Sequence, residues 1–374
     1  MTTIPPATIG MALEDVDTPA LLIDLDAFDR NLRRLADAVA GSPVRLRPHA
    51  KTHKCPTIAL KQMALGAVGV CCQKVGEAEA MVHGGVSNVL VSNEIVGKTK
   101  VARLAALARL AEVTVCADDP IHVAQLSEAA VAYGVELPVL VEVEVGTPRC
   151  GVQPGQPVLD LARRITAAPG LRFGGLQAYN GTAQHLRHEA ERREAIQSAV
   201  HMVRESLELL ARDGIPCECV SGAGTGTFPH ERDSGVYTEL QAGSYVFMDV
   251  DYARNLDAQG TPVSTFEHSL FVYSTVISRP KAERAVLDAG LKAYTMESGK
   301  PQVRDMPDVP VDRVSDEHCT LRLDAASPDF ALGDKLMLIP GHCDPTVNLH
   351  DWYVGIRNGR VEALWPISAR GAIT

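Results

Sequence analysis

The chain has 374 residues, of which 46% are hydrophobic and 22% are charged, and this composition excludes the disordered, collagen-like and coiled-coil classes. Its 36 basic and 46 acidic residues give a net charge of −10, so we expect no nucleic-acid or membrane partner. No basic-then-apolar leader opens the sequence, and no apolar run approaches the roughly 18 residues of a membrane span. We therefore predict a cytoplasmic protein whose nine cysteines are free thiols.

The first two thirds of the chain alternate strand-like and helical patterns. Residues 18–24 resemble a strand, and Asp26 is the expected N-cap of the helix that follows. Eight apolar runs come next, at residues 44–48, 68–72, 89–92, 113–116, 139–145, 174–179, 217–221 and 239–243. Eight β/α units in about 220 residues predict a TIM-like (β/α)₈ barrel, with a doubly wound open sheet as the alternative.

From about residue 256 the pattern changes to strands with short polar turns. Apolar segments at residues 265–278, 284–293, 320–324, 335–339 and 352–366 show little helical periodicity. The turn Asn358-Gly359 between two of these runs predicts a hairpin, because Asn-Gly tolerates the positive φ of a type I′ turn. The sequence therefore predicts an α/β barrel followed by a mostly β domain.

Basic side chains concentrate after the first barrel run, at His49, Lys51, His53 and Lys54. Barrel enzymes build their sites at the carboxyl ends of the strands, where Lys51 is expected to lie. A partly desolvated lysine beside other cations has a lowered pKa and can form a Schiff base with a carbonyl cofactor. The alternative for this cluster alone is a solvated basic loop.

Three further groups also follow strand-like runs. The glycine-rich segment 221–227 offers backbone amides and threonine hydroxyls to a phosphate, and it lacks the lysine of a P-loop. Arg149 lies between two glycines and can donate to a phenolate or carboxylate. Tyr179 can stack on a planar ring, and His185, expected to open the next helix, can act as a general base.

A possible metal pair stands in the β domain. In an extended segment, His342 and Asp344 would face the same way and grip one ion. One imidazole and one carboxylate suit Mn²⁺ or Mg²⁺ better than a closed zinc site. A hydrogen-bonded turn is the alternative for this motif.

Together, these motifs resemble the fold-type III pyridoxal-phosphate enzymes, the alanine-racemase-like group, and within it the branch of D-threonine aldolase and D-serine dehydratase. The resemblance covers nearly the whole chain, and its segments are residues 49–54, 69–74, 146–151, 239–245, 288–292 and 341–344. It implies that the first strand joins the β domain, which gives a barrel of residues 26–255 and a β domain of residues 1–25 and 256–374. It also implies a head-to-tail homodimer.

The resemblance also implies roles for the candidate residues. Lys51 would hold pyridoxal 5'-phosphate, with Arg149 at its phenolic oxygen, Tyr179 against the ring or phosphate and Gln241 near the pyridine nitrogen. The phosphate would rest on Gly224, Thr225, Gly226, Gly243 and Ser244. His185 or a metal-bound hydroxide would remove the proton of the substrate hydroxyl.

The metal pair distinguishes the members of this branch. The metal-pair motif of the dehydratases resembles His-x-Cys. This chain has His-x-Asp at that place, as the aldolases do. We therefore predict a lyase that cleaves D-threonine to glycine and acetaldehyde with the help of a divalent metal. Residues 47–51 resemble D-threonine aldolases and residues 347–355 resemble 3-hydroxy-D-aspartate aldolases, so the latter activity is the first alternative. A D-serine dehydratase-like lyase, an amino-acid racemase and a non-catalytic pyridoxal-phosphate carrier are further alternatives.

Overall fold

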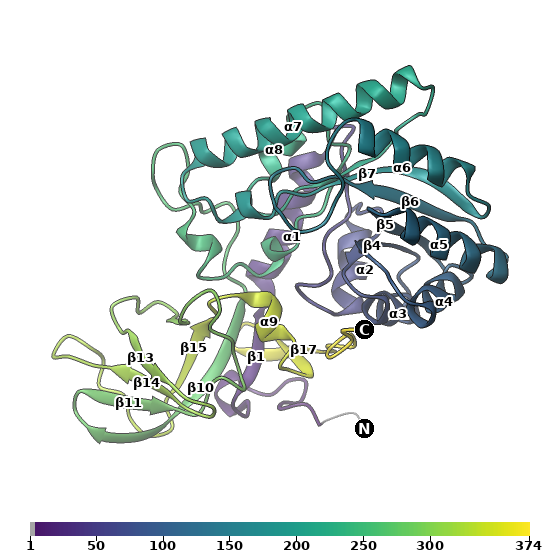
Figure 1. The fold of residues 1–374 in the computed structure, drawn as a ribbon. Coiled ribbons are helices and arrows are strands. Elements are labelled where there is room, and N and C mark those ends of the chain that lie inside the picture. The colour runs from purple at the N-terminus through teal and green to yellow at the C-terminus, as the bar shows by residue number, and fades with distance from the viewer. Residues whose placement is uncertain (1–3) are drawn as a thin grey trace.

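A computed structural model describes residues 4–374 as a helix-covered parallel barrel beside a twisted β-sheet (Figure 1). The first three residues lie outside the described part. The expectation about a leader, and the start of the predicted segment 1–25, therefore fall partly on residues that the structure does not describe. None of the helices in residues 4–374 combines the length and the apolar character that crossing a bilayer requires.

The barrel contains eight parallel strands in the order β2-β9-β8-β7-β6-β5-β4-β3. Hydrogen bonds from Cys71 N to Pro48 O (2.9 Å) and from Ala50 N to Cys71 O (2.8 Å) join the two outer strands. The sheet therefore closes on itself, which confirms the predicted barrel and excludes the doubly wound alternative. Its strands are β2 (Arg45–Leu46), β3 (Val70–Cys72), β4 (Asn88–Glu94), β5 (Glu112–Ala117), β6 (Leu137–Glu142), β7 (Leu171–Ala178), β8 (Val220–Gly222) and β9 (Glu239–Leu240).

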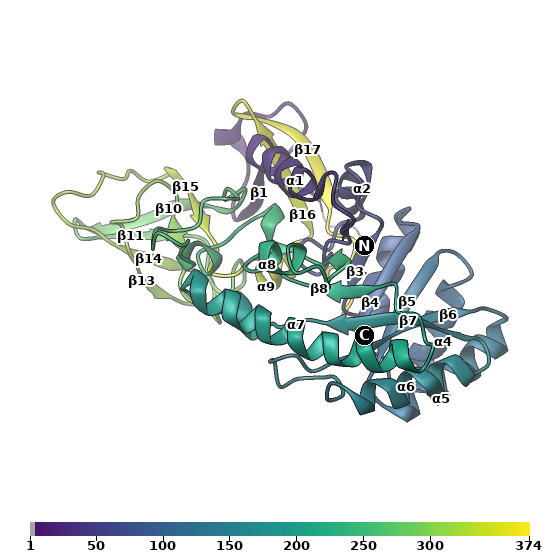
Figure 2. The ribbon, with the colours of Figure 1, turned by 90° about the horizontal axis from the view of Figure 1, so that it is seen from above.

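Helices cover the outside of the barrel, as Figure 2 shows from above. They are α1 (Leu25–Val39), α2 (Pro56–Ala64), α3 (Val75–His83), α4 (Lys98–Leu107), α5 (Pro120–Tyr133), α6 (Gln156–Ala167), α7 (Glu189–Arg212) and the short α8 (Phe228–Arg232). The expected N-cap at Asp26 is wrong: helix α1 is capped by Asp24, whose carboxylate accepts from the amides of Asp26 and Ala27. Asp26 instead pairs with Arg357.

The second sheet incorporates the first strand of the chain. Strand β1 (Ala20–Asp24) pairs antiparallel with β10 (Leu270–Lys281) and parallel with β16 (Trp352–Arg357). The other members are β11 (Arg284–Leu287), β12 (Gln302–Val303), β13 (Val311–Val314), β14 (Cys319–Arg322), β15 (Lys335–Ile339) and β17 (Arg360–Pro366). Asn358 and Gly359 have φ values of 49° and 69°, as the predicted hairpin turn requires.

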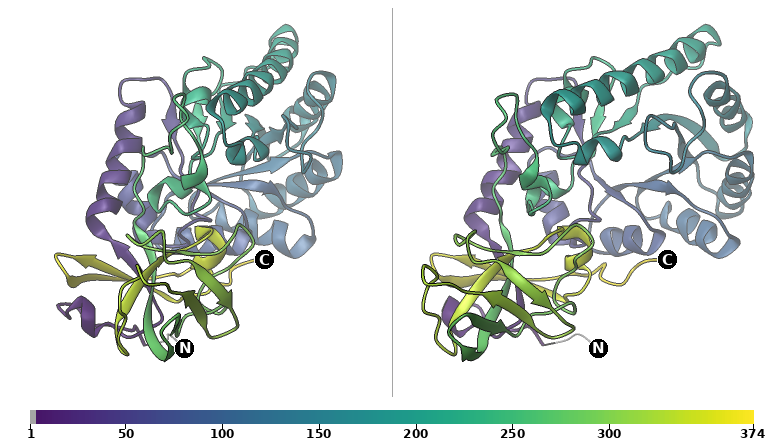
Figure 3. Two further views of the ribbon diagram at one scale, coloured as in Figure 1. Left: turned by 90° about the vertical axis from the view of Figure 1, so that its left-hand side faces the viewer. Right: turned by 60° about the vertical axis from the view of Figure 1, so that its left-hand side comes forward.

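The β sheet lies against one side of the barrel (Figure 3), and a few hydrogen bonds join the two parts. The amides of Val250 and Asp251 donate to the carbonyls of Pro340 and Gly341, just before helix α9 (Cys343–Val347). The hydroxyl of Tyr353 donates to the carbonyl of His53 at 2.7 Å. These contacts bring α9 close to the loop that carries Lys51.

Candidate active site

One pocket gathers most of the residues that the sequence singled out. Lys51, Arg149, Tyr179, Gly224, Thr225, Gln241, Gly243 and Ser244 all line it. They come from loops or strand ends on different β/α units, and they meet because the carboxyl ends of parallel strands face one rim of a barrel. The pocket also includes His49 of the basic cluster and Ala223 of the glycine-rich segment, and residues to which the sequence reasoning gave no role: Thr52, Gln73, Ser92, Gln177 and Tyr252.

The amine of Lys51 is directed toward the metal pair expected from the sequence. Its Nζ lies 3.3 Å from Asp344 Oδ2, and its side chain is 42% exposed. The charge of Asp344 raises the pKa of Lys51, and this effect outweighs burial, which lowers it. The predicted lowered pKa of Lys51 is therefore wrong, because the sequence pattern did not indicate a carboxylate arriving from a segment almost three hundred residues away.

The other basic residues of this cluster are buried in contacts of their own. The Nδ1 of His49 accepts from the Lys51 amide, and its Nε2 lies 3.0 Å from the Gln73 amide. Burial lowers the pKa of His49 well below its usual value, and that of His53 to about 4. Lys54 pairs with Glu77 at 3.1 Å. The solvated-loop interpretation is therefore excluded, and among these four only His49 and Lys51 line the pocket.

Arg149 and Tyr179 lie together on another wall. The guanidinium carbon of Arg149 is 5.7 Å from the centre of the Tyr179 ring, within the range of a cation–π contact. Arg149 Nη2 lies 3.5 Å from Glu142 Oε1. Burial raises the pKa of the Tyr179 phenol, so this ring is neutral near pH 7 and suited to packing against a planar group.

Backbone amides form the anion-binding side of the pocket. Within residues 4–374, the amides of Gly224, Thr225, Gly243 and Ser244 donate no hydrogen bond to the protein. A Cβ at Gly243 would lie 2.9 Å from the His49 carbonyl oxygen, so this close approach requires glycine. Gly226 differs, because its amide donates to Gln184 Oε1 at 3.0 Å and it lines a neighbouring cavity instead.

Gln241 ends a buried polar network below the pocket. Its Nε2 donates to Gln177 Oε1 at 2.7 Å and to Ser221 Oγ at 2.8 Å. Ser221 donates to Glu239 Oε1 at 2.7 Å, and Glu239 also accepts from Arg47 Nε at 2.9 Å. The orientation of the Gln241 amide is therefore fixed by a chain of contacts that crosses the barrel interior.

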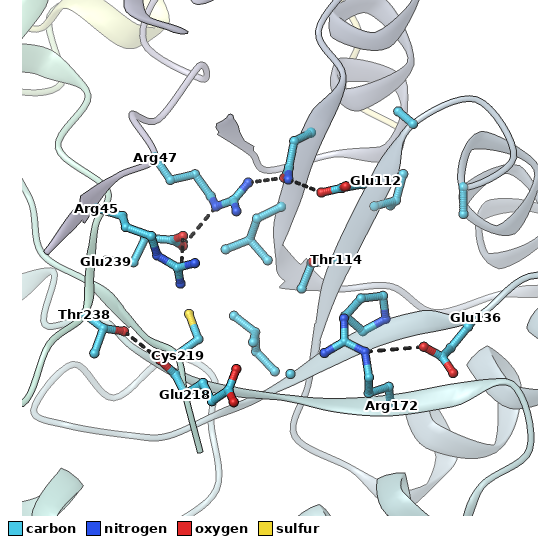
Figure 4. Close-up of a pocket in the computed structure, with 18 of the residues that line it drawn as sticks. Arg45, Arg47, Glu112, Thr114, Glu136, Arg172, Glu218, Cys219, Thr238 and Glu239 are labelled. Carbon is cyan, nitrogen blue, oxygen red and sulfur yellow. Dashed lines mark hydrogen bonds and ion pairs between the residues drawn. The ribbon is translucent and has the colours of Figure 1, made fainter. Parts of the chain in front are cut away.

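A larger cavity, of about 740 Å³, has a different set of residues around it. Figure 4 shows its side chains in pairs, with Arg47 near Glu239 and Arg172 near Glu136. The cavity includes the amino-terminal strand residues Glu112 and Glu239, so it lies at the barrel end opposite Lys51. Because its arginines already have carboxylate partners, we assign this cavity a structural role.

The metal pair lies at the start of helix α9. His342 is the N-cap and Asp344 lies in the first turn, so the expected extended segment is wrong. His342 Nδ1 lies 3.1 Å from Asp249 Oδ2. Burial lowers the pKa of His342, but the hydrogen bond to Asp249 and the charges of Asp344 and Asp249 raise it to about 9.

His185 lies beside the pocket and does not line it. It ends a 3-10 turn, η2 (Thr182–His185), and helix α7 begins only at Glu189, so the expectation that it opens the helix is wrong. Its Nδ1 lies 2.6 Å from Asp251 Oδ2, and its ring centre lies 6.0 Å from that of Tyr252. The segment Asp249-Val-Asp251, which lies between two 3-10 turns, supplies the partners of both histidines. The sequence reasoning did not identify this segment.

A closed barrel with a lysine and a row of free backbone amides at one rim is typical of barrel enzymes that bind a phosphorylated coenzyme. The sequence-family model of the alanine racemase N-terminal domain matches residues 23–251. The family model of a putative serine dehydratase domain matches residues 269–356. The chain therefore belongs to the alanine-racemase-like family of fold-type III enzymes. Membership in this family supports pyridoxal phosphate as the coenzyme.

Relatives of known activity narrow the class. The chain is 48% identical to a D-threonine aldolase of Arthrobacter sp. over 98% of this chain and 96% of that protein. It is 46% identical to a 3-hydroxy-D-aspartate aldolase of Paracoccus denitrificans over 98% and 95%. A crystal structure of D-threonine aldolase from Filomicrobium marinum matches with a TM-score of 0.96 and 51% identity, covering 100% of both chains. The predicted class, an aldolase, is confirmed.

Proposed function

We propose that this chain is a pyridoxal-phosphate- and divalent-metal-dependent enzyme that cleaves D-threonine to glycine and acetaldehyde. The observation that carries the proposal is that the candidate coenzyme amine, which lines the pocket, contacts a candidate metal ligand. Lys51 Nζ lies 3.3 Å from Asp344 Oδ2, and His342 lies two residues before Asp344. His342 and Asp344 are not among the residues that line the pocket, and the contact between Lys51 and Asp344 is what places the candidate amine beside the candidate metal ligands.

The pocket fits the coenzyme. The four unpartnered amides of Gly224, Thr225, Gly243 and Ser244 suit a dianionic phosphate. The half-buried Tyr179 offers a ring face, and the Gln241 amide offers a neutral polar contact. Arg149 supplies a cation for the phenolic oxygen. When bound, pyridoxal phosphate supplies a ring that takes up the electron pair left by Cα–Cβ cleavage.

The residues at α9 fit a divalent metal. Asp344 Oδ1 is buried and has no hydrogen-bond partner, and Asp249 engages Nδ1 of His342, so that Nε2 remains to bind an ion. A carboxylate behind a metal-binding histidine is a common arrangement. When bound, Mn²⁺ or Mg²⁺ lowers the pKa of the substrate β-hydroxyl. His185, oriented by Asp251, is our candidate for removing the hydroxyl proton.

The first experiment compares substrates on the purified enzyme with Mn²⁺ present. We expect D-threonine to yield acetaldehyde and glycine, and L-threonine to yield neither, because the protein contacts fix one orientation of the Cα substituents. Aldehyde release is measured with a coupled dehydrogenase, and glycine by chromatography. Release of a keto acid with ammonia, or racemisation without aldehyde, would contradict the proposal.

The second candidate is 3-hydroxy-D-aspartate, which would yield glycine and glyoxylate. Two observations favour it: the 46% identity to an aldolase of that name, and the cations beside Asp251. Arg187 pairs with Asp251, and Arg254 Nη1 lies 3.8 Å from it. Arg187 is fully engaged by Asp251, but the side chain of Arg254 is 48% exposed and its contact with Asp251 is long, so Arg254 is the cation that could hold a second substrate carboxylate. Comparing kcat/KM for the two substrates decides between the candidates.

We also propose that the chain works as a homodimer in the cytoplasm. The support is the family resemblance, in which a partner's β domain lies near the barrel mouth. Lys51 is 42% exposed in the single chain, which agrees with a site that a second subunit covers. Sedimentation velocity at micromolar concentration tests this, and a monomer that turns over substrate at full rate would contradict it.

A further inference from the structure

A group of acidic side chains and a thiol at the barrel mouth has no role in the proposed reaction. Glu94 ends β4, Asp118 follows β5 and Glu142 ends β6, which are neighbouring strands of the parallel sheet. Cys150 lies in the loop after β6. Carboxylate oxygens of Glu94 and Asp118 and the Sγ of Cys150 all lie within 4.8 Å of one another.

The loop after β6 fixes the thiol in this position. The amide of Val152 donates to the carbonyl of Glu142, and the amide of Glu144 donates to the carbonyl of Val152, so the chain folds back on the end of the strand. The amide of Gly151 donates to Asp118 Oδ2 at 2.9 Å. Gly151 has a φ of 107°, and a Cβ there would lie 2.6 Å from the Glu144 nitrogen.

Glu142, whose Oε1 lies 3.5 Å from Arg149 Nη2, is a buried carboxylate beside the same group. The side chain of Glu142 is 5% exposed, and its Oε2 has no hydrogen-bond partner. Glu94 Oε1 is likewise buried without a partner. Arg149 contacts Oε1 of Glu142 and leaves Oε2 without a partner. A cation or a shared proton would stabilise the unpartnered carboxylate oxygens of Glu142 and Glu94.

We propose that Glu94, Asp118 and Cys150, with Glu142 beside them, form a second divalent-cation site separate from His342 and Asp344. Two carboxylates and a thiol favour a thiophilic borderline ion such as Zn²⁺ over Mg²⁺. Zinc with bond lengths of about 2.0–2.3 Å needs its ligand atoms roughly 3.5 Å apart, so binding would draw the three groups together. His122 Nδ1 lies 3.1 Å from Asp118 Oδ1 and would orient that ligand.

The test measures zinc content of the holoenzyme. Chelator-treated wild type and variants are dialysed against Zn²⁺, and metal per chain is measured by plasma mass spectrometry. We expect Cys150→Ser and Glu94→Gln to hold one ion fewer than wild type, and Cys217→Ser, another partly buried free cysteine, to match wild type. Bound-coenzyme absorbance and circular dichroism verify that each variant is folded.

Cobalt separates this site from the proposed catalytic one. Co²⁺ bound by a thiolate gives intense visible bands, which we expect in wild type and in Asp344→Asn but not in Cys150→Ser. Loss of the bands in Asp344→Asn with retention in Cys150→Ser would overturn the inference and leave the catalytic metal intact. Equal zinc content in wild type, Cys150→Ser and Glu94→Gln, including no zinc in any of them, would also overturn it.

Discussion

Replacing Lys51 with alanine is expected to abolish turnover and the visible absorbance of bound pyridoxal phosphate. Lys51 is the amine that lines the pocket beside the anion-binding amides, and no neighbouring lysine can replace it, because Lys54 is held by Glu77. Loss of a covalent catalytic group costs on the order of a thousand-fold or more in kcat. Absorbance spectra and aldehyde release measure the two effects.

Two further variants make the Lys51 result interpretable. Lys51→Arg keeps a cation opposite Asp344, so it preserves the electrostatic balance of the pocket while removing the nucleophilic amine. Lys61→Ala removes an exposed lysine of helix α2 and should leave turnover and spectrum unchanged. If Lys51→Arg retains both absorbance and turnover, the coenzyme is held by another residue and the proposed role of Lys51 is wrong.

The barrel was predictable because its strands are short apolar runs separated by helices of regular period. The β-rich part was predicted less completely. Strands β12 and β13 span only Gln302–Val303 and Val311–Val314, which is too short to show the alternation of apolar and polar residues that indicates a strand. The cap of α1 was misassigned by two residues, because Asp24 and Asp26 are both N-cap residue types and only the backbone decides which one accepts amide protons.

The candidate site was predictable where local sequence carries the chemistry. A glycine-rich loop after a strand indicates an anion site, and a lysine among histidines indicates an unusual amine. What local sequence could not provide was the long-range pairing. Asp344 reaches Lys51, and Asp249 reaches His342, only through packing of α9 against the barrel. The pKa of Lys51 depends on that packing, and its direction was therefore predicted wrongly.

The position of the metal pair links the two parts of the molecule. His342 and Asp344 come from the segment between β15 and β16 of the β sheet, whereas Lys51 comes from the barrel. Cys343 N donates to Asp249 Oδ2 at 3.0 Å, the same oxygen that contacts His342. One barrel-side carboxylate therefore sets both the start of α9 and the orientation of the imidazole.

Replacing Asp344 with asparagine is expected to reduce D-threonine cleavage by roughly a hundred-fold or more, with no recovery at high Mn²⁺. The substitution removes the charged ligand of a two-residue site but keeps its shape.

Replacing Asp249 with asparagine is expected to reduce D-threonine cleavage less than the Asp344 substitution does. It loosens the orientation of His342, which weakens metal affinity by roughly 10–100-fold, so excess Mn²⁺ should restore most of its kcat. Titrating each variant with Mn²⁺ separates the two behaviours.

The wild-type enzyme provides the matching control for metal dependence. We expect chelation to remove activity and Mn²⁺ to restore it, while the absorbance of bound coenzyme persists throughout, because the amine and the anion-binding amides do not depend on the ion. Unchanged turnover after exhaustive chelation, or full activity in Asp344→Asn, would show that the β-hydroxyl is deprotonated without a metal. Proton removal would then fall to a protein base, and His185, held at 2.6 Å by Asp251, would be the residue to replace first.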